Sequence, residues 1–156
     1  MQDKIILIED HDYKRTKIID FLVSHYKNVD ILQAKSYTSG KDILGEEGVK
    51  LLLLDVSLPT YDKTAEESGG RFRALGGREL ARRAIRLNPN LPIVFITQFK
   101  SFKEKDSSYS FDDLTDVLKK DCGECFRGVI FFDGAISSWK ESLEEVLKGI
   151  GFVCEY

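Results

Sequence analysis

Long apolar runs and an even set of cysteines are both missing from this sequence. No stretch of the 156 residues approaches the roughly 18 apolar residues of a membrane-spanning helix. The N-terminal residues MQDKIILIED pass straight into an apolar segment, without the basic region and cleavage site of a signal peptide. Three cysteines are an odd number, unlike the paired set of a small disulfide-linked fold. We therefore expect a cytoplasmic protein with reduced thiols and no membrane association.

A strong charge of one sign is also missing. The net charge of −3 is too small to indicate bulk attraction to nucleic acid or to acidic membranes. No segment resembles a helix-turn-helix or another nucleic-acid module, so we expect no direct nucleic-acid partner. Internal repeats and low-complexity linkers are absent as well. With about 150 residues to a domain as a first guide, residues 1–156 are expected to form a single domain.

Apolar runs alternate with segments of helical spacing along the whole chain. The runs predict strands within residues 4–10, 28–36, 49–55, 91–97 and 127–133. The intervening segments predict helices within residues 11–26, 37–48, 78–88, 111–120 and 137–151. Five strands in alternation with five helices favour an α/β fold with a doubly wound, five-stranded parallel sheet.

Local signals predict where some of these helices begin and end. Ser110 with Asp113 is typical of a helix N-terminus, and either Ser137 or Ser138 is expected to cap the last helix. Gly149 is expected near the end of that helix. The polar segments 60–77 and 98–110 are predicted to be long loops, and long loops in compact domains are usually functional or mobile.

Acidic residues stand at the ends of several predicted strands. Glu9 and Asp10 follow the first strand, Asp55 the third and Asp133 the fifth, while Thr97 ends the fourth. Ligands of doubly wound sheets bind beyond the carboxyl ends of the strands. Several carboxylates in one cleft repel one another unless a hard cation is present, and a small set of oxygen ligands suits Mg²⁺. The pattern therefore predicts a magnesium site.

Three segments together resemble one protein family. IILIEDHDYKR, beginning at Ile5, is similar to the first strand and acidic pair of bacterial response-regulator receiver domains. LLLLDVSLP is similar to their phosphoacceptor strand, and IVFIT to their fourth strand. The resemblance covers essentially the whole chain in order. It implies a stand-alone receiver domain of flavodoxin-like architecture with strand order 2-1-3-4-5.

The resemblance implies a role for each matching residue. Asp55 would accept a phosphoryl group from a histidine kinase or a phosphotransfer protein. Asp10, helped by Glu9, would hold Mg²⁺ together with Asp55 and the backbone carbonyl of Ser57, which neutralises charge during phosphoryl transfer. Thr97 would donate its hydroxyl to the new phosphoryl group and switch contacts with a downstream protein.

The sequence departs from the family where receivers carry a lysine at the end of strand five. Depending on a one-residue choice of alignment, either Phe132 or Asp133 falls there, and neither supplies a positive charge. Other lysines that are candidates for this charge are Lys100, Lys103 and Lys140. Gln98 is a second departure, because the family usually has a small residue after the switch threonine.

These departures leave two other functions open. One is a pseudo-receiver, which keeps the fold and acts as a protein-interaction domain without phosphorylation. The other is a Mg²⁺-dependent phosphohydrolase with an aspartyl nucleophile, because VIFFDGAISS faintly resembles the haloacid-dehalogenase phosphatases. In that family a second acid is expected two residues after the nucleophile, whereas Ala135 stands two residues after Asp133.

Three further features have more than one interpretation. Arg78, Arg82 and Arg86 share one helical face, which is either a solvated surface or a docking patch for an acidic partner. Cys122 and Cys125 have redox or metal spacing, but zinc needs about four ligands, so a structural pair is favoured. The apolar tail GFVCEY either packs on its own sheet or pairs with a second copy in a homodimer.

Overall fold

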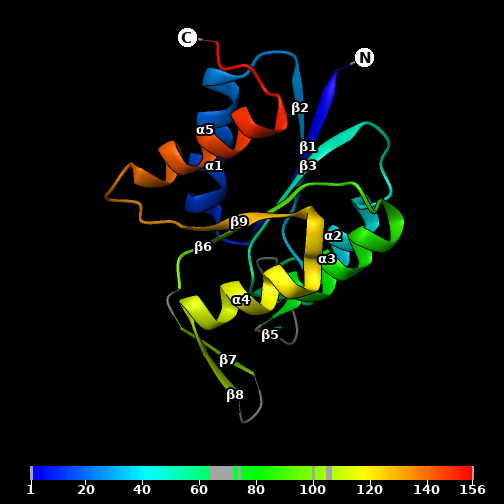
Figure 1. The fold of residues 1–156 in the computed structure, drawn as a ribbon, viewed down its shortest axis with the longest axis vertical. Helices are drawn as coiled ribbons and strands as arrows, with labels where there is room; N and C mark the ends of the chain where they lie inside the picture. Colours follow the sequence, from blue (N-terminus) through cyan, green and yellow to red (C-terminus); the bar gives the residue numbers. More distant parts are fainter. Residues whose placement is uncertain (1, 64–71, 74, 100, 105–106, 156) are drawn as a thin grey trace.

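A computed structural model describes residues 2–63, 72–73, 75–99, 101–104 and 107–155. At its centre lies a five-stranded parallel sheet (Figure 1). Its strands are β1 (Asp3–Ile8), β2 (Val29–Ala34), β3 (Val49–Leu54), β6 (Ile93–Thr97) and β9 (Phe126–Phe131). Their spatial order is β2-β1-β3-β6-β9. Counted along the chain, these five strands have the order 2-1-3-4-5, which confirms the predicted architecture.

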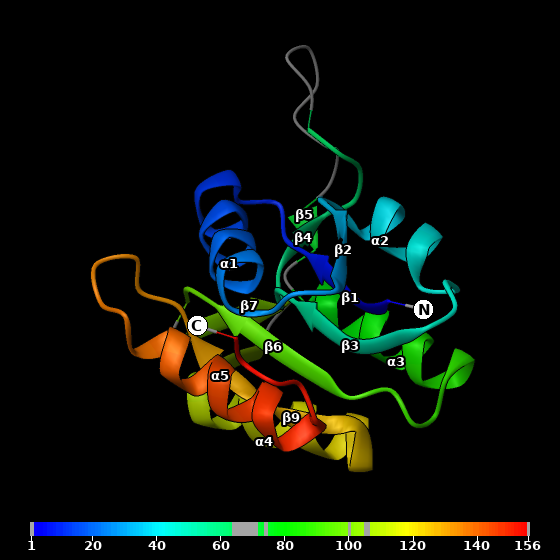
Figure 2. The same cartoon turned by 90° about the horizontal axis from the view of Figure 1, so that it is seen from above.

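Five helices cover the two faces of the sheet. They are α1 (Asp12–His25), α2 (Tyr37–Ile43), α3 (Gly76–Leu87), α4 (Phe111–Cys122) and α5 (Ser138–Ile150). One hydrophobic cluster packs α1 and α5 against the sheet, and a second packs α3 and α4 against the opposite face (Figures 1 and 2). This double covering explains why the strands are continuous apolar runs.

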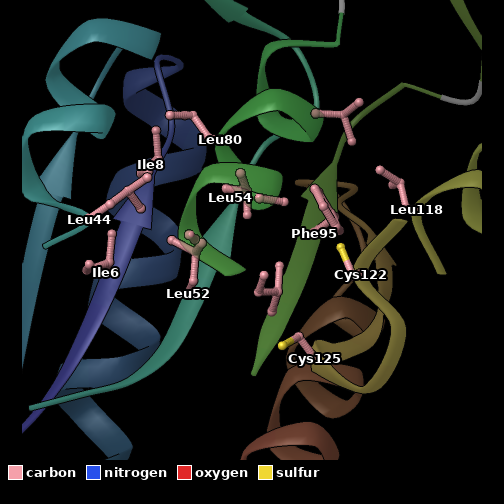
Figure 3. Packing of buried hydrophobic residues seen from close by; sticks show 14 of the residues in the cluster. Ile6, Ile8, Leu44, Leu52, Leu54, Leu80, Phe95, Leu118, Cys122 and Cys125 are labelled. Atoms are coloured by element: carbon pink, nitrogen blue, oxygen red, sulfur yellow. The ribbon is translucent and has the colours of Figure 1, made fainter. Parts of the chain in front are cut away.

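Side-chain alternation along β3 divides its leucines between the two faces. Leu52 and Leu54 point into the cluster shared with α3 and α4 (Figure 3), whereas Leu51 and Leu53 face α1 and α5. All four are fully buried. Because both faces of β3 are covered, its strand end is held in place from two sides, and the position of Asp55, the next residue, is fixed accordingly.

Short antiparallel strands appear in the two segments predicted to be loops. The strand β4 (Leu58–Pro59) pairs with β5 (Phe72–Arg73), and β7 (Ser101–Glu104) pairs with β8 (Ser107–Ser110). The prediction of a loop over residues 98–110 is therefore wrong. The sequence pattern does not predict this hairpin, because its strands are four residues long, mostly polar and without the apolar alternation that indicates a strand. Residues 64–71 and 74 lie outside the described residues, so the role of segment 60–77 stays a prediction.

The predicted helix ends are partly confirmed. Ser110 caps α4 in a capping box, with its hydroxyl accepting from the Asp113 N–H. Ser137 stands at the N-cap of α5, where its side chain makes no capping hydrogen bond. That helix runs through Gly149 and ends at Gly151, because Gly151 adopts a left-handed φ of 112° that favours glycine.

The arginine face of α3 makes contacts within the molecule. Arg78 forms an ion pair and hydrogen bonds with Asp121 of α4, and Arg82 lies 3.3 Å from the same carboxylate. These contacts join two neighbouring helices. Two of the three arginines thus stabilise the helix pair, which neither interpretation of the face anticipated.

Cys122 and Cys125 belong to the core. Both side chains are buried in the cluster around α3 and α4 (Figure 3), and the Cys125 thiol donates to the Pro89 carbonyl. Burial raises the pKa of Cys122 to about 12 and also raises that of Cys125. Protonated, buried thiols are poor nucleophiles and poor metal ligands, so the structural interpretation of the pair is the one that the fold supports.

The C-terminal tail packs on its own domain. The ring of Phe152 lies 6.3 Å from that of Tyr26, and the Glu155 N–H donates to the His25 carbonyl. The tail therefore covers the C-terminal end of α1. Among the described residues, no helix is both long enough and apolar enough to cross a membrane.

Candidate functional site

Three carboxylates converge at the carboxyl edge of the sheet. Glu9 and Asp10 follow β1 directly, and Asp55 follows β3, the neighbouring strand. One oxygen atom from each of the three lies within 4.8 Å of the others. The structure thus brings together the three acidic side chains that the sequence predicts to hold Mg²⁺.

Asp55 is held by backbone contacts on both sides. Its N–H donates to the Ile8 carbonyl, and its Oδ1 accepts from the Val56 N–H at 2.8 Å. Gly77, in the first turn of α3, donates its N–H to the Val56 carbonyl. A Cβ on Gly77 would lie 2.0 Å from the Asp55 carbonyl oxygen, so only glycine allows α3 to approach so closely. The carboxylate of Asp55 is 4% exposed.

A lysine that the sequence analysis did not single out lies among these acids. The ammonium of Lys14, from the first turn of α1, is 2.5 Å from Oε1 of Glu9 and 3.4 Å from Oδ2 of Asp55. It also donates to the Ile96 carbonyl at 2.6 Å. Lys14 is fully buried. Its three N–H groups thus have three oxygen partners, one beyond each of β1 and β3 and one in β6.

The pattern of α1 contains a signal for this lysine. The buried positions of the helix include Lys14, Ile18, Phe21 and Leu22, which follow the spacing of one inward-facing stripe. A lysine at the first position of an apolar stripe either extends to the surface or is buried with partners. Glu9 and Asp55 supply those partners here, and their nearness to Lys14 becomes visible only in the folded chain.

Glu9 is buried at least as deeply as Asp55, with 1% of its side chain exposed. While one of its oxygens contacts Lys14, the other accepts from the His11 N–H at 3.0 Å. Burial, together with the charge of Asp55, raises the pKa of Glu9 to about 8 although Lys14 opposes the shift. Burial also raises the pKa of Asp55, again against the influence of Lys14. The site therefore has more negative charge than its buried lysine can balance.

Asp10 faces the outside of the cluster. Its carboxylate is 14% exposed and lies 3.2 Å from the ammonium of Lys63, itself 53% exposed. A pocket of about 100 Å³ opens beside it, lined by Asp10, Asp12, Lys35 and Lys63. A polar pocket therefore adjoins Asp10, the more exposed member of the cluster.

Thr97 and Ser57 stand at the neighbouring strand ends. Thr97 is fully buried as the last residue of β6, and its hydroxyl accepts from the Phe99 N–H at 3.2 Å. Ser57 lies two residues after Asp55 and is buried. Gln98, next to Thr97, is half-buried.

The structure places some of the residues considered for the position of the missing lysine at the end of the fifth strand. The Phe132 side chain is buried between α1 and α5, with its ring 5.1 Å from that of Trp139. Asp133 accepts from the Ala135 N–H and is not a member of the acidic cluster found among the described residues. The Lys140 ammonium lies over the Trp139 ring. Lys100 lies outside the described residues, as does the side chain of Lys103.

The donor set fits a divalent cation. When all three carboxyl groups are ionised, they carry two more negative charges than the buried ammonium of Lys14 balances, apart from the exposed Lys63. Carboxylate oxygens are the ligands that Mg²⁺ prefers, and it usually keeps several waters, for which the pocket beside Asp10 has room. Glu9, Asp10 and Asp55 are therefore the residues that would hold the ion.

The sequence comparisons are distant. No family model matches the chain. An uncharacterized protein, y4jR, of Sinorhizobium fredii (strain NBRC 101917 / NGR234) is 21% identical over 143 residues, which is 90% of this chain and 94% of that protein.

Solved structures similar to this fold include receiver domains. A response regulator receiver domain protein from Clostridium thermocellum has a TM-score of 0.64 at 15% identity, with 95% of this chain and 93% of that chain covered. The non-phosphorylated HemR receiver domain from Leptospira biflexa has a TM-score of 0.64 at 17% identity, with 99% of each chain covered. The phosphorylated cyanobacterial phytochrome response regulator RcpA has a TM-score of 0.65 at 17% identity, with 95% and 93% covered.

These likenesses, together with the strand order, show that the chain has the receiver-domain fold. The resemblance read from the sequence is confirmed at that level. The roles of individual residues rest on the geometry of the site.

Proposed function

We propose that this protein is a signalling receiver that accepts a phosphoryl group on Asp55 with the help of Mg²⁺. The observation that carries the proposal is the convergence of Glu9, Asp10 and Asp55 within 4.8 Å at the carboxyl edge of a receiver fold. Asp10 and Glu9 would hold the ion with Asp55 and the carbonyl of Ser57. When bound, Mg²⁺ supplies the positive charge that offsets repulsion between the Asp55 carboxylate and an anionic phosphoryl donor.

The protein's own residues perform the remaining tasks. The contacts of Asp55 with Ile8 and Val56 hold its carboxylate at the strand end, so little reorganisation is needed at the moment of transfer. Thr97 would turn its hydroxyl to donate its O–H to the phosphoryl group, and this turn would displace the oxygen that now accepts from the Phe99 N–H. This exchange would alter the segment after β6 and hence the surface offered to a downstream protein.

The proposal includes a class of partners. A histidine kinase or a phosphotransfer protein would supply the phosphoryl group in the cytoplasm, and a downstream protein would bind the switched surface. This scheme is compatible with a homodimer that leaves the apolar tail in contact with Tyr26 and His25 of its own chain. The whole of residues 1–156 is proposed to act as one domain.

Intact-mass analysis tests the proposal. The wild type, Asp55→Ala and Asp10→Ala are incubated with acetyl phosphate, with and without Mg²⁺. We expect a single phosphoryl adduct that needs Mg²⁺ and Asp55 and is reduced in Asp10→Ala. A folded wild type that gains no adduct contradicts the proposal.

One observation favours the pseudo-receiver as the second candidate. Both oxygens of Asp55 already have partners, Val56 and Lys14, and the side chain is almost fully buried. A partner protein would then recognise the fold without phosphorylation. Failure of the mass experiment, with Mg²⁺ binding retained, would support this alternative. The phosphohydrolase receives no comparable support, because Asp133 lies apart from the acidic cluster.

A further inference from the structure

Lys14 has the position expected of the residue that neutralises a modified Asp55. It is fully buried, and its ammonium is 3.4 Å from Oδ2 of Asp55. A buried ammonium is costly unless it is paired and hydrogen-bonded. Lys14 satisfies this condition with Glu9, Asp55 and the Ile96 carbonyl. The side chain of Lys14 is therefore held in the acidic site by its own contacts.

Phosphoryl transfer to Asp55 would increase the negative charge beside this ammonium. One carboxylate oxygen forms the new bond to phosphorus as the bond between phosphorus and the donor breaks. With a phosphohistidine donor a phosphorus–nitrogen bond breaks and the imidazole leaves, and with acetyl phosphate a phosphorus–oxygen bond breaks and acetate leaves. The single negative charge of Asp55 is replaced by that of a phosphoryl group, about −1.5 to −2 at neutral pH for phosphate esters of side chains. A cation in contact with Asp55 gains most from this change.

Arg15, the other buried cation near the site, already has hydrogen-bond partners outside the Asp55 carboxylate. Among the described residues, the buried basic side chains are Lys14 and Arg15. The guanidinium of Arg15 donates to the Glu9 carbonyl and to Asp12. Lys63 pairs with Asp10 and is half exposed. Of the buried cations that the structure describes, Lys14 is thus the one that contacts the carboxylate of Asp55.

We infer that Lys14 binds the phosphoryl oxygens on Asp55, and that α1 supplies the positive charge that is missing from the end of β9. This inference rests on the proposed function. Phe132, at the end of β9, packs beside α1, with its ring 6.5 Å from that of Tyr13, the neighbour of Lys14.

The same lysine connects the modified residue to the switch strand. Its ammonium donates to the Ile96 carbonyl and forms ion pairs with the carboxylates of Glu9 and Asp55. New bonds to phosphoryl oxygens are therefore made at the expense of Glu9 or of the Ile96 carbonyl, which directly precedes Thr97. Lys14 thereby couples the chemistry at Asp55 to the end of β6.

Binding of beryllofluoride, a phosphoryl mimic, tests the inference. Bound fluoride is followed by ¹⁹F NMR in the presence of Mg²⁺, and Mg²⁺ affinity alone is measured by calorimetry, for the wild type, Lys14→Met and Lys17→Met. We expect Lys14→Met to lose at least about tenfold in beryllofluoride affinity, the size of a lost hydrogen bond to a charged group. Its Mg²⁺ affinity should be equal or higher, because a competing cation is gone. Lys17→Met, the matched control at an exposed lysine of the same helix, should bind beryllofluoride within about threefold of the wild type.

The possible failures are distinguishable. If the wild type binds beryllofluoride and folded Lys14→Met binds it equally well, the inference alone is overturned. If the wild type does not bind it, the proposed function fails and the inference with it. Where circular dichroism finds Lys14→Met unfolded, the double variant Lys14→Met with Glu9→Gln is compared with Glu9→Gln, because this pair removes one charge of each sign. Equal beryllofluoride affinity in these two variants overturns the inference.

Discussion

The ammonium of Lys14 lies 3.4 Å from Oδ2 of Asp55, although 41 positions of sequence separate the helix residue from the strand-end residue. Glu9 shares the same ammonium at 2.5 Å. One cation thus serves two buried carboxylates, and the pKa of each carboxyl is raised, mainly by burial. Removing one of these carboxylates, or binding a further cation beside them, should therefore change the stability of the folded protein.

Replacing Asp55 by Asn should stabilise the metal-free protein. The change removes a buried carboxylate whose pKa is raised mainly by burial, and it leaves Glu9 paired with Lys14, so we expect a higher melting temperature than that of the wild type. Mg²⁺ should raise the melting temperature of the wild type and have little effect on Asp55→Asn. Thermal melts with and without Mg²⁺ measure both effects, and Asp20→Asn, an exposed change on α1, is the control. An Asp55→Asn variant less stable than the wild type without Mg²⁺ would contradict this account.

The ion pair between α3 and α4 should make stability depend on pH. Partial burial acts to raise the pKa of Asp121, but the hydrogen bonds and charges of Arg78 and Arg82 prevail and lower it from 3.8. The folded state therefore binds fewer protons than the unfolded state, and the stabilisation is present above pH 3.8 and lost as pH falls through the lowered value. We expect Asp121→Asn to cost about 0.5–1.5 kcal/mol at pH 7.

Urea unfolding of both proteins at pH 7 and near pH 2.5 measures this dependence. The difference between Asp121→Asn and the wild type should shrink at the acidic end. A difference that stays constant across this range would mean that the carboxylate charge contributes nothing.

Gly77→Ala should destabilise the protein and disturb Asp55. The new Cβ would lie 2.0 Å from the Asp55 carbonyl oxygen, which is backbone and cannot turn aside as a side chain does. We expect a loss of about 1–3 kcal/mol or more, measured by urea unfolding. Gly149→Ala is a suitable control, because its Cβ meets nothing within 4 Å and alanine favours the interior of α5. Equal stability of Gly77→Ala and the wild type would contradict the close packing described above.

The three thiols should differ in reactivity. Cys122 and Cys125 are buried with raised pKa values, whereas Cys154 is half-buried in the tail. Titration of the native protein with a disulfide reagent at pH 8 should modify Cys154 first, and the other two only after unfolding. The Cys154→Ser variant, nearly unreactive when native, is the control. Rapid native modification of Cys122 or Cys125 would argue against a purely structural pair.

The apolar runs of this sequence were sufficient to predict the sheet and its acidic edge. Leu51 to Leu54 alternate between two covered faces, and such a run leaves few options except a central parallel strand. The acids follow from it, because parallel strands bring their carboxyl ends to one edge. Glu9, Asp10 and Asp55 were therefore found without any structure.

Lys14 could not be found in this way. Its role depends on the rotation of α1 about its axis and on a side chain that is usually exposed, and local sequence fixes neither. Sequence comparison with receivers directed attention to the end of β9, where Phe132 stands. The hairpin β7–β8 was missed for a different reason, since two short polar strands pair through their backbones and leave little trace in the pattern of side chains.

The hairpin begins four residues after Thr97 and its second strand ends at Ser110, the cap of α4 (Figure 1). A four-residue strand is about 13 Å long. The pair of strands starts close to Thr97, the residue proposed as the switch, so a tilt of about 10° at its base would move the far end of the strands by roughly 2 Å. If Thr97 acts as proposed, a small rearrangement at the acidic site would become a larger displacement of the hairpin, which a spin label there would register.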